Sequence, residues 1–183
     1  MPNVNSSCGL AAALGLGMVV LAGCATTATT QSDCYPHIFL DSRYAIQGTS
    51  RESAATLRDS GCYHFVYQGG RIVRVDHRQG GALTPDPTSG VATIRIEHPE
   101  GIEKRVFLDA GGRPTANQDG AYAITLRYDE KRNPVEWRNL GADDRPKEAK
   151  DSGLAMFRWR YDPQGQPVEE RHFGLNEQLK ADR

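Results

Sequence analysis

Alternating apolar and polar residues constrain the fold of this chain most strongly. Three stretches, residues 92–97, 124–128 and 157–161, alternate with a period of two, which is typical of strands with one buried and one solvated face. A turn-rich segment follows each stretch, and a second strand then begins at Ile102, Val135 or Val168. The pattern therefore predicts a series of antiparallel hairpins.

The hairpins form a sequence repeat of 32 or 33 residues. Tyr128-Asp129 returns as Tyr161-Asp162, and two further pairs of segments match at the same spacing: Asn133-Pro134-Val135-Glu136 with Gln166-Pro167-Val168-Glu169, and Arg113-Pro114 with Arg145-Pro146. Residues 63–77 resemble a first, degenerate copy that turns at Gln68-Gly69-Gly70. Because one such unit cannot bury its apolar face alone, neighbouring units are expected to stack. We predict a mainly β fold, an antiparallel meander of about four hairpins and eight strands.

One short helix is predicted before the hairpins. Thr49 or Ser50 supplies a capping hydroxyl, and Glu52 lies in the first turn, where a negative charge is favourable. The helix is expected to end at Gly61, next to Cys62.

The first 32 residues contain no charged side chain. Within them, residues 10–22 form an apolar run that is too short to span the ~30 Å hydrocarbon core as a helix but has the length of a secretory h-region. The run ends in Leu21-Ala22-Gly23-Cys24, which resembles a bacterial lipobox. The resemblance implies cleavage before Cys24 and attachment of a diacylglyceryl group to its sulfur, so that the chain contacts a membrane through its lipid.

The lipobox also divides the chain. Residues 1–23 would be a lipoprotein signal peptide, residues 24–33 a lipidated polar tether, and residues 34–183 a single domain. Residue 25 is Ala, whereas Asp at this position retains lipoproteins of the enteric type at the inner membrane. The resemblance therefore implies an outer-membrane location facing the periplasm.

Four cysteines are present, and each has a distinct expected place. Cys8 leaves with the signal peptide, and Cys24 is the lipidation site. Cys34 and Cys62 remain as an even pair in an oxidising compartment, so we predict a disulfide between them. The alternative, a reactive or metal-binding pair, lacks the CxxC spacing that such sites use.

The stretch Tyr-Asp-x-x-Gly-Gln-Pro-Val-Glu at residues 161–169 resembles the Tyr-Asp repeats of bacterial RHS-type cell-surface proteins. Those proteins build long strips of β-sheet from hairpins. The resemblance covers about residues 120–173 and implies hairpin geometry, but no activity.

Sequence motifs for catalysis or metal binding are not evident. The five histidines, at positions 37, 64, 77, 98 and 172, include no His-Glu-x-x-His pattern, and the chain has no Gly-x-Ser-x-Gly elbow. A Ser-His-Asp triad that uses Ser42, Ser53 or Ser89 stays open. A formal net charge of -1 argues against a nucleic-acid partner. We expect no catalytic residue, metal ion or cofactor.

The two faces of the predicted strands differ in chemistry. Phe157, Trp159 and Tyr161 share one face, which we interpret as core, with an aromatic strip for a protein or glycan as the alternative. On the opposite face the repeat register places Arg95 opposite Glu103, Arg127 opposite Glu136 and Arg160 opposite Glu169. We predict a binding face there, formed by Arg95, Arg127, Arg158, Arg160, Glu136 and Glu169.

These expectations together describe a lipid-anchored envelope protein that acts as a non-enzymatic protein-binding or scaffold module. Its partner would be an unidentified envelope protein or toxin. Two alternatives remain: an immunity-type lipoprotein that inhibits a secreted toxin in the periplasm, and a periplasmic hydrolase with an unrecognised site.

Overall fold

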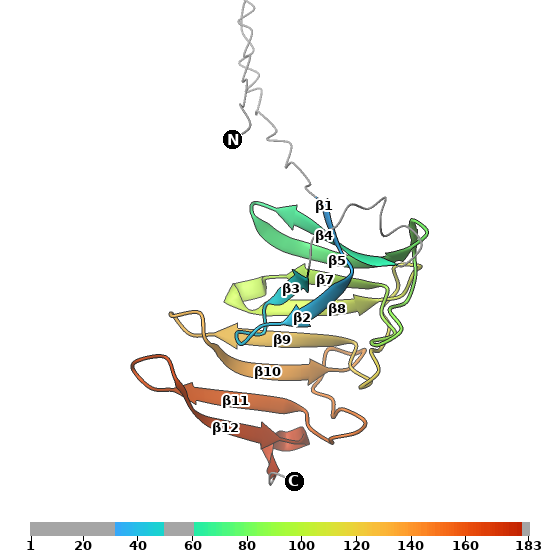
Figure 1. Cartoon of the computed structure of the whole chain (residues 1–183). Coiled ribbons are helices and arrows are strands. Elements are labelled where there is room, and N and C mark those ends of the chain that lie inside the picture. Colours follow the sequence, from blue (N-terminus) through green and yellow to red (C-terminus); the bar gives the residue numbers. More distant parts are fainter. Residues whose placement is uncertain (1–31, 50–60, 181–183) are drawn as a thin grey trace, which may run out of the picture.

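The computed structural model describes residues 32–49 and 61–180, which form one large and one small antiparallel sheet (Figure 1). The large sheet has eleven strands, and ten of them follow the order β1-β4-β5-β7-β8-β9-β10-β11-β12-β13, while β6 pairs with β5 outside this path. The small sheet is the hairpin β2-β3. The strands are β1 (Ser32–Tyr35), β2 (His37–Leu40), β3 (Ile46–Thr49), β4 (Cys62–Gln68), β5 (Arg71–Gln79), β6 (Ala82–Leu83), β7 (Thr93–Glu97), β8 (Glu103–Leu108), β9 (Ala123–Tyr128), β10 (Pro134–Leu140), β11 (Met156–Tyr161), β12 (Pro167–Phe173) and β13 (Leu179–Lys180).

The mainly β antiparallel meander predicted from the sequence is confirmed. From β4 to β12, each long strand pairs with the next long strand along the chain, and the eight expected hairpin strands are β4, β5, β7, β8, β9, β10, β11 and β12. The sequence did not indicate the short strands β1, β2, β3, β6 and β13. Two 3-10 turns, η1 (Pro99–Gly101) and η2 (Leu175–Glu177), are the helical elements of the described residues. The helix expected after Thr49 falls on residues 50–60, which lie outside the described residues; Thr49 itself ends β3.

An Asp-capped turn recurs through the repeat. In three turns, Asp109, Asp129 and Asp162 each accept a hydrogen bond from the backbone N–H four residues later, at 2.8–2.9 Å. Proline follows directly, as Pro114, Pro134 and Pro167, and pairs with the residue before the Asp. The fourth position of the turn is left-handed, with φ of 77° at Gly112, 67° at Arg132 and 83° at Gly165. The turn is therefore preserved at residue 132 even though the glycine is replaced by arginine.

The repeat uses this turn on both sides of the large sheet where strands end, and not at its outer strands. The turns after Tyr128 and Tyr161 lie at the left-hand edge in Figure 1, together with the β4–β5 turn and η1. The turns that contain Arg113-Pro114 and Arg145-Pro146 follow Leu108 and Leu140 and lie at the opposite edge. We call the left-hand side the turn edge.

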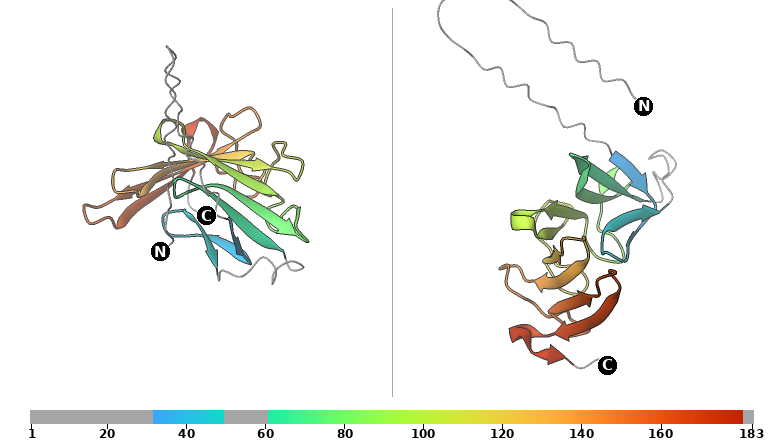
Figure 2. Two further views of the ribbon diagram at one scale, coloured as in Figure 1. Left: turned by 90° about the horizontal axis from the view of Figure 1, so that it is seen from above. Right: turned by 90° about the vertical axis from the view of Figure 1, so that its left-hand side faces the viewer.

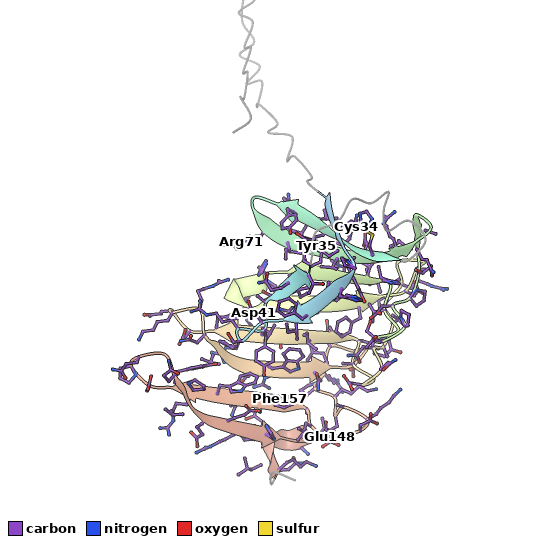
Figure 3. The ribbon with its side chains drawn as sticks, in the orientation of Figure 1. Cys34, Tyr35, Asp41, Arg71, Glu148 and Phe157 are labelled. Carbon is purple, nitrogen blue, oxygen red and sulfur yellow. A yellow bond between two sulfur atoms is a disulfide. The ribbon has the colours of Figure 1, made fainter. Side chains whose placement is uncertain are left out.

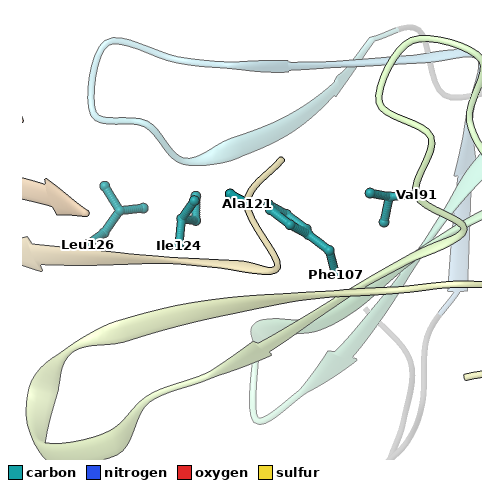
Figure 4. Packing of buried hydrophobic residues seen from close by; sticks show 5 residues of the cluster. All are labelled: Val91, Phe107, Ala121, Ile124 and Leu126. Atoms are coloured by element: carbon teal, nitrogen blue, oxygen red, sulfur yellow. The ribbon is translucent and has the colours of Figure 1, made fainter. Parts of the chain in front are cut away.

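The hairpin β2-β3 covers part of one face of the large sheet (Figures 1 and 2). We call this the front face and the opposite one the back face. Ile46 of β3 packs with Phe65, Val75 and Ile96 in a buried cluster. A neighbouring cluster, shown in Figure 4, lies beside the hairpin and contains Val91, Phe107, Ala121, Ile124 and Leu126. The front face under the hairpin is thus the main core of the domain.

Two residues that were expected in the polar tether belong to strand β1. Ser32 and Asp33, assigned above to the polar tether, pair with Val66 and Phe65 of β4. The backbone hydrogen bonds to β4, together with the disulfide of the next residue, Cys34, explain why these polar residues are part of a strand.

The Cys34–Cys62 disulfide predicted from the sequence is confirmed. It joins β1 to the first residue of β4, with the Cα atoms 5.8 Å apart and both residues 4% exposed. Because β1 contains only four residues and forms the outer edge of the sheet, the cross-link fastens its otherwise weak edge pairing.

Replacing both Cys34 and Cys62 by Ala is expected to lower the free energy of unfolding by about 3–4 kcal/mol, since the bridge closes a loop with a sequence separation of 28. Urea denaturation followed by the fluorescence of Trp137 and Trp159 measures the change. Reduction of the unmodified protein should give the same loss. A loss below about 1 kcal/mol in both experiments would contradict a structural role for the bridge.

Candidate functional site

Aromatic side chains line a shallow hollow on the front face, beyond the end of the covering hairpin. The hollow has a volume of about 220 Å³. Its aromatic walls are Tyr44 from the β2-β3 turn, Trp137 from β10, and Phe157 and Trp159 from β11. Phe157 lies well below the hairpin in the view of Figure 3. We call this site the aromatic groove.

The four rings of the aromatic groove form a continuous chain of contacts, from Trp137 through Tyr44 and Trp159 to Phe157. Tyr44 meets Trp137 edge-on at a centroid distance of 5.4 Å and lies 5.0 Å from Trp159. Phe157 and Trp159 are nearly parallel, with 6° between their planes and 6.0 Å between their centroids. These distances lie in the range in which aromatic pairs attract each other beyond simple area burial. The contacts hold the rings in fixed positions, as a preformed binding surface requires.

Tyr44 reaches this position because of the turn that carries it. One carboxylate oxygen of Asp41 accepts hydrogen bonds from the backbone N–H groups of Arg43 and Ala45, at 2.8 and 2.9 Å. The N–H of Tyr44 donates to the Asp41 carbonyl, and Tyr44 adopts a left-handed φ of 57°. Burial alone would raise the pKa of Asp41, but the backbone and Gln47 hydrogen bonds hold this pKa below its ordinary value. The charged form of Asp41 therefore stabilises the turn that presents Tyr44.

Polar groups border the aromatic groove. Asn139 accepts a hydrogen bond from the indole N–H of Trp137 at 2.9 Å and donates one to the carbonyl of Leu154 at 3.1 Å. Asp119 and Ser152 also line the groove, and both are exposed. A hollow with aromatic walls and a few polar groups at its rim is typical of a binding site for a mixed apolar and polar ligand.

The aromatic face predicted from Phe157, Trp159 and Tyr161 divides into core and surface. Trp159 is buried at 8% exposure, while Phe157 and Tyr161 are half-buried, and the hydroxyl of Tyr161 donates to the carbonyl of Pro134. Sequence reasoning did not indicate Tyr44, because it lies nearly a hundred residues before Trp137. An aromatic residue close after Asp41 in a short turn would have been the available signal.

The predicted register of the back-face charges is confirmed for two of three pairs. Arg127 lies opposite Glu136, and Arg160 lies opposite Glu169 with an ion pair of 3.0 Å. The third pair is wrong, because Arg95 lies opposite Val106 and pairs with Glu97 of its own strand at 2.8 Å. The β7-β8 turn contains η1, with left-handed Glu100 and Gly101, so it does not have the spacing of the other turns.

The predicted binding residues of the back face are largely paired with one another. Glu136, only 6% exposed, accepts hydrogen bonds from Arg138 at 2.7 Å and from Arg158 at 2.9 Å. Arg138 and Arg158 also each contact Glu177, at 3.1 Å. This network fixes β10 against β11 and η2. Because the charges of these guanidinium groups are already neutralised by Glu136 and Glu177, they contribute little to binding a partner.

The carboxyl group of Glu136 is charged because of its arginine partners. Burial is the largest influence and would raise its pKa, but the hydrogen bonds and charges of Arg138 and Arg158 outweigh it and hold the pKa below its ordinary value. Since the folded-state pKa is depressed, the contribution to stability is present above the unfolded pKa, about 4.3. It is lost as the pH falls through the folded pKa.

The residues considered for a catalytic triad have structural contacts. The Ser89 hydroxyl donates to Asp86 at 2.7 Å, and Asp86 also accepts from the backbone N–H groups of Thr88 and Ser89. His77 lines the same small hollow, of about 80 Å³, but its Nδ1 lies 2.9 Å from the carbonyl of Thr84. These contacts fix the loop before β7. Ser42 lies in the exposed β2-β3 turn, and Ser53 lies outside the described residues.

One cluster has the composition of a metal site. The Sγ atoms of Cys34 and Cys62 and a ring nitrogen of His64 lie within 4.8 Å of one another. The two sulfurs are bonded to each other and are therefore not available as thiolate ligands. Burial is the main reason that the pKa of His64 lies below its ordinary value, and the charge of Arg78 acts in the same direction.

Comparisons of the chain with protein-family models, with curated proteins and with solved structures found no significant match. Within residues 32–49 and 61–180 there is no helix with the length and apolar character needed to cross a membrane.

Replacing Glu136 by Gln is expected to lower the free energy of unfolding by about 1–3 kcal/mol at pH 7, because charge-assisted hydrogen bonds from two arginines are weakened in a buried place. Urea denaturation over a pH series measures the effect. The difference from the unmodified protein should shrink as the pH falls from the unfolded pKa of about 4.3 through the lower folded-state pKa of Glu136.

Glu169→Gln is the matched control for this change. Glu169 also binds two arginines, Arg160 and Arg171, but it is more exposed than Glu136. A loss of about 0–1 kcal/mol is expected there. Equal losses at the two positions would show that burial of Glu136 does not strengthen its ion pairs.

Proposed function

We propose that this protein is a lipid-anchored, non-enzymatic binding module of the bacterial cell envelope, attached through Cys24 and facing the periplasm. Its ligand is a protein, and the aromatic groove is the surface that contacts it. The observation that carries the proposal is an ordered set of four aromatic rings on a part of the front face that the β2-β3 hairpin leaves uncovered. Tryptophan and tyrosine dominate the energetic centres of protein interfaces.

The aromatic groove supports a binding role better than the back face does. Binding a partner at the back face would first require breaking the ion pairs of Glu136 and Glu169, with little net gain. The aromatic groove offers rings that are already in place, so little conformational entropy is lost when a ligand binds. Exposed polar groups at its rim, Asp119 and Ser152, can accept or donate the few hydrogen bonds that give orientation.

The order of the strands sets the distance between the proposed anchor and the aromatic groove. Seven residues lie between Cys24 and Ser32, so their Cα atoms are eight steps and at most about 28 Å apart. The anchor would thus attach to the β1 edge of the sheet. In strand order, β10 and β11 are six and seven steps from β1, or about 30 Å along the sheet at ~4.8 Å a step. The aromatic groove would therefore lie on the part of the domain far from the membrane, where a periplasmic protein can reach it.

Replacing Cys24 by Ser is expected to leave an unprocessed chain, because the thiol that receives the lipid is absent. Mass spectrometry of the protein from envelope fractions measures the N-terminus and any acyl mass. The unmodified chain should begin at an acylated Cys24. A mature N-terminus at another residue, without acyl mass, would contradict the anchor, and it would leave the aromatic groove to be tested separately.

A photoreactive benzoylphenylalanine placed at position 157 is expected to cross-link a protein partner in intact cells, because Phe157 lines the aromatic groove. Gel mobility and mass spectrometry identify the adduct. Phe39, which is 50% exposed on the covering hairpin, is the matched control, since the same replacement there also substitutes a phenylalanine.

A specific adduct should form at position 157 and not at position 39, and Trp137→Ala in the same chain should reduce its yield about ten-fold, as loss of an aromatic centre of an interface does. Equal adducts at both positions, or an adduct insensitive to Trp137→Ala, would contradict the proposed surface.

A further inference from the structure

A second hollow lies on the front face, between the β2-β3 hairpin and the turn edge. We infer that it binds an anionic group, a carboxylate or a phosphate, carried on a small apolar body. The hollow has a volume of about 330 Å³. Basic side chains enter it from four different elements, and we call it the anion pocket. These side chains are Arg71, His98, Arg105 and Arg132.

Arg105 forms the floor of the anion pocket. Its side chain is only 3% exposed, which is rare for an arginine without full pairing. The guanidinium contacts Glu103 at 2.6 Å through Nη2 and at 2.7 Å through Nε, and Nη2 also donates to the carbonyl of Tyr44. None of the described residues accepts a hydrogen bond from Nη1. The buried guanidinium of Arg105 therefore keeps N–H donors at the floor of the hollow that no described residue accepts. Leaving a buried donor without an acceptor costs free energy.

Arg71 and Arg132 enter from the turn edge. Arg71 begins β5 directly after the β4-β5 turn, and Figure 3 shows it on the same side of the molecule as Asp41. Arg132 occupies the left-handed position of its Asp-capped turn, and its guanidinium lies 5.2 Å from the centre of the Tyr128 ring. Both residues are exposed, and no carboxylate of the described residues forms an ion pair with either.

The arginines of the opposite edge show a different arrangement. Arg113 pairs with Asp109 at 3.0 Å, and Arg145 lies 3.7 Å from Asp143, each within its own turn. The corresponding aspartate next to Arg132 is Asp129, whose side chain accepts from the backbone and amide of Asn133 instead. The carboxylate of Asp41, in the neighbouring hairpin turn, already accepts hydrogen bonds from the backbone N–H groups of Arg43 and Ala45 and from the side-chain amide of Gln47. Within residues 32–49 and 61–180, the guanidinium groups of Arg71 and Arg132 are thus left without a carboxylate partner.

The charge balance of the anion pocket favours a negative ligand. Three guanidinium groups face it, and Glu103 is the single carboxylate among its lining residues. Arginine recognises carboxylate and phosphate oxygens through paired N–H donors. Apart from Gln47, the remaining side chains of the wall are largely apolar and include Ile46, Ile72, Ile96 and Tyr67. A ligand that places its charged end near the arginines would lay its apolar part against these side chains.

The experiment titrates the full chain with three probes: acetate, hexanoate and inorganic phosphate, at constant ionic strength set with chloride. Resonances of the arginine Nε–H groups and nearby backbone amides in ¹H–¹⁵N NMR spectra report where each probe binds. Hexanoate is expected to bind more tightly than acetate, by about four-fold for each methylene that is buried. Comparison of acetate with phosphate identifies the preferred charged group.

The double variant Arg71→Gln, Arg132→Gln is expected to weaken binding about ten-fold. The double variant Arg113→Gln, Arg145→Gln removes the same net charge from exposed turns at the opposite edge and is expected to leave binding within about two-fold. Because all four side chains are exposed, neither variant should change the thermal unfolding midpoint appreciably.

Two outcomes would overturn the inference. One is equal weakening by the two double variants, which would indicate general electrostatic attraction. The other is the absence of shifts around Arg105 with any probe at tens of millimolar. Neither outcome bears on the aromatic groove, so failure here is separate from failure of the proposed function.

Discussion

The structure depends on the register that its Asp-capped turns impose. Each turn joins a carboxylate to the N–H four residues later, and the following proline then faces the residue that precedes the Asp. A shift by one residue would exchange the two faces of the strands that these turns join, β8 to β12. Buried Leu126 would then face solvent, and Arg127 would enter the core. The turns therefore determine which residues face the hairpin and which form the charged back face.

The alternation of apolar and polar residues was sufficient to predict eight strands, because a period of two over five or more residues is a strong signal. The repeat then indicated which strands are joined as hairpins. The same reasoning could not find β2 and β3. Each has only four residues, and β3 contains Gly48, which weakens a strand signal. The structure gives a reason for this glycine: a Cβ atom at residue 48 would overlap the ring of Tyr35. Packing between distant segments, not local preference, makes this hairpin.

The sites were harder to predict than the strands for the same reason. Sequence analysis placed Phe157 and Trp159 on one face, which is correct, but it could not show that the covering hairpin ends before them. It placed Arg95 and Glu103 together because it assumed that all turns are alike, whereas η1 changes the spacing. Arg105 was not among the residues that the sequence pattern singled out. Its burial follows from the hairpin that covers it, and no pattern near residue 105 indicates that hairpin.

Tyr44 joins the two hollows of the front face. Its ring is a wall of the aromatic groove, and its carbonyl accepts a hydrogen bond from Arg105 at the floor of the anion pocket. Both contacts depend on the short turn that Asp41 holds, and this turn belongs to a hairpin with its own two-stranded sheet. Because Tyr44 is in a left-handed conformation, the turn has few alternative geometries that keep the ring and the carbonyl in place together. Arg105 and the rings of Trp137 and Trp159 therefore all contact Tyr44, and the two hollows share this one turn.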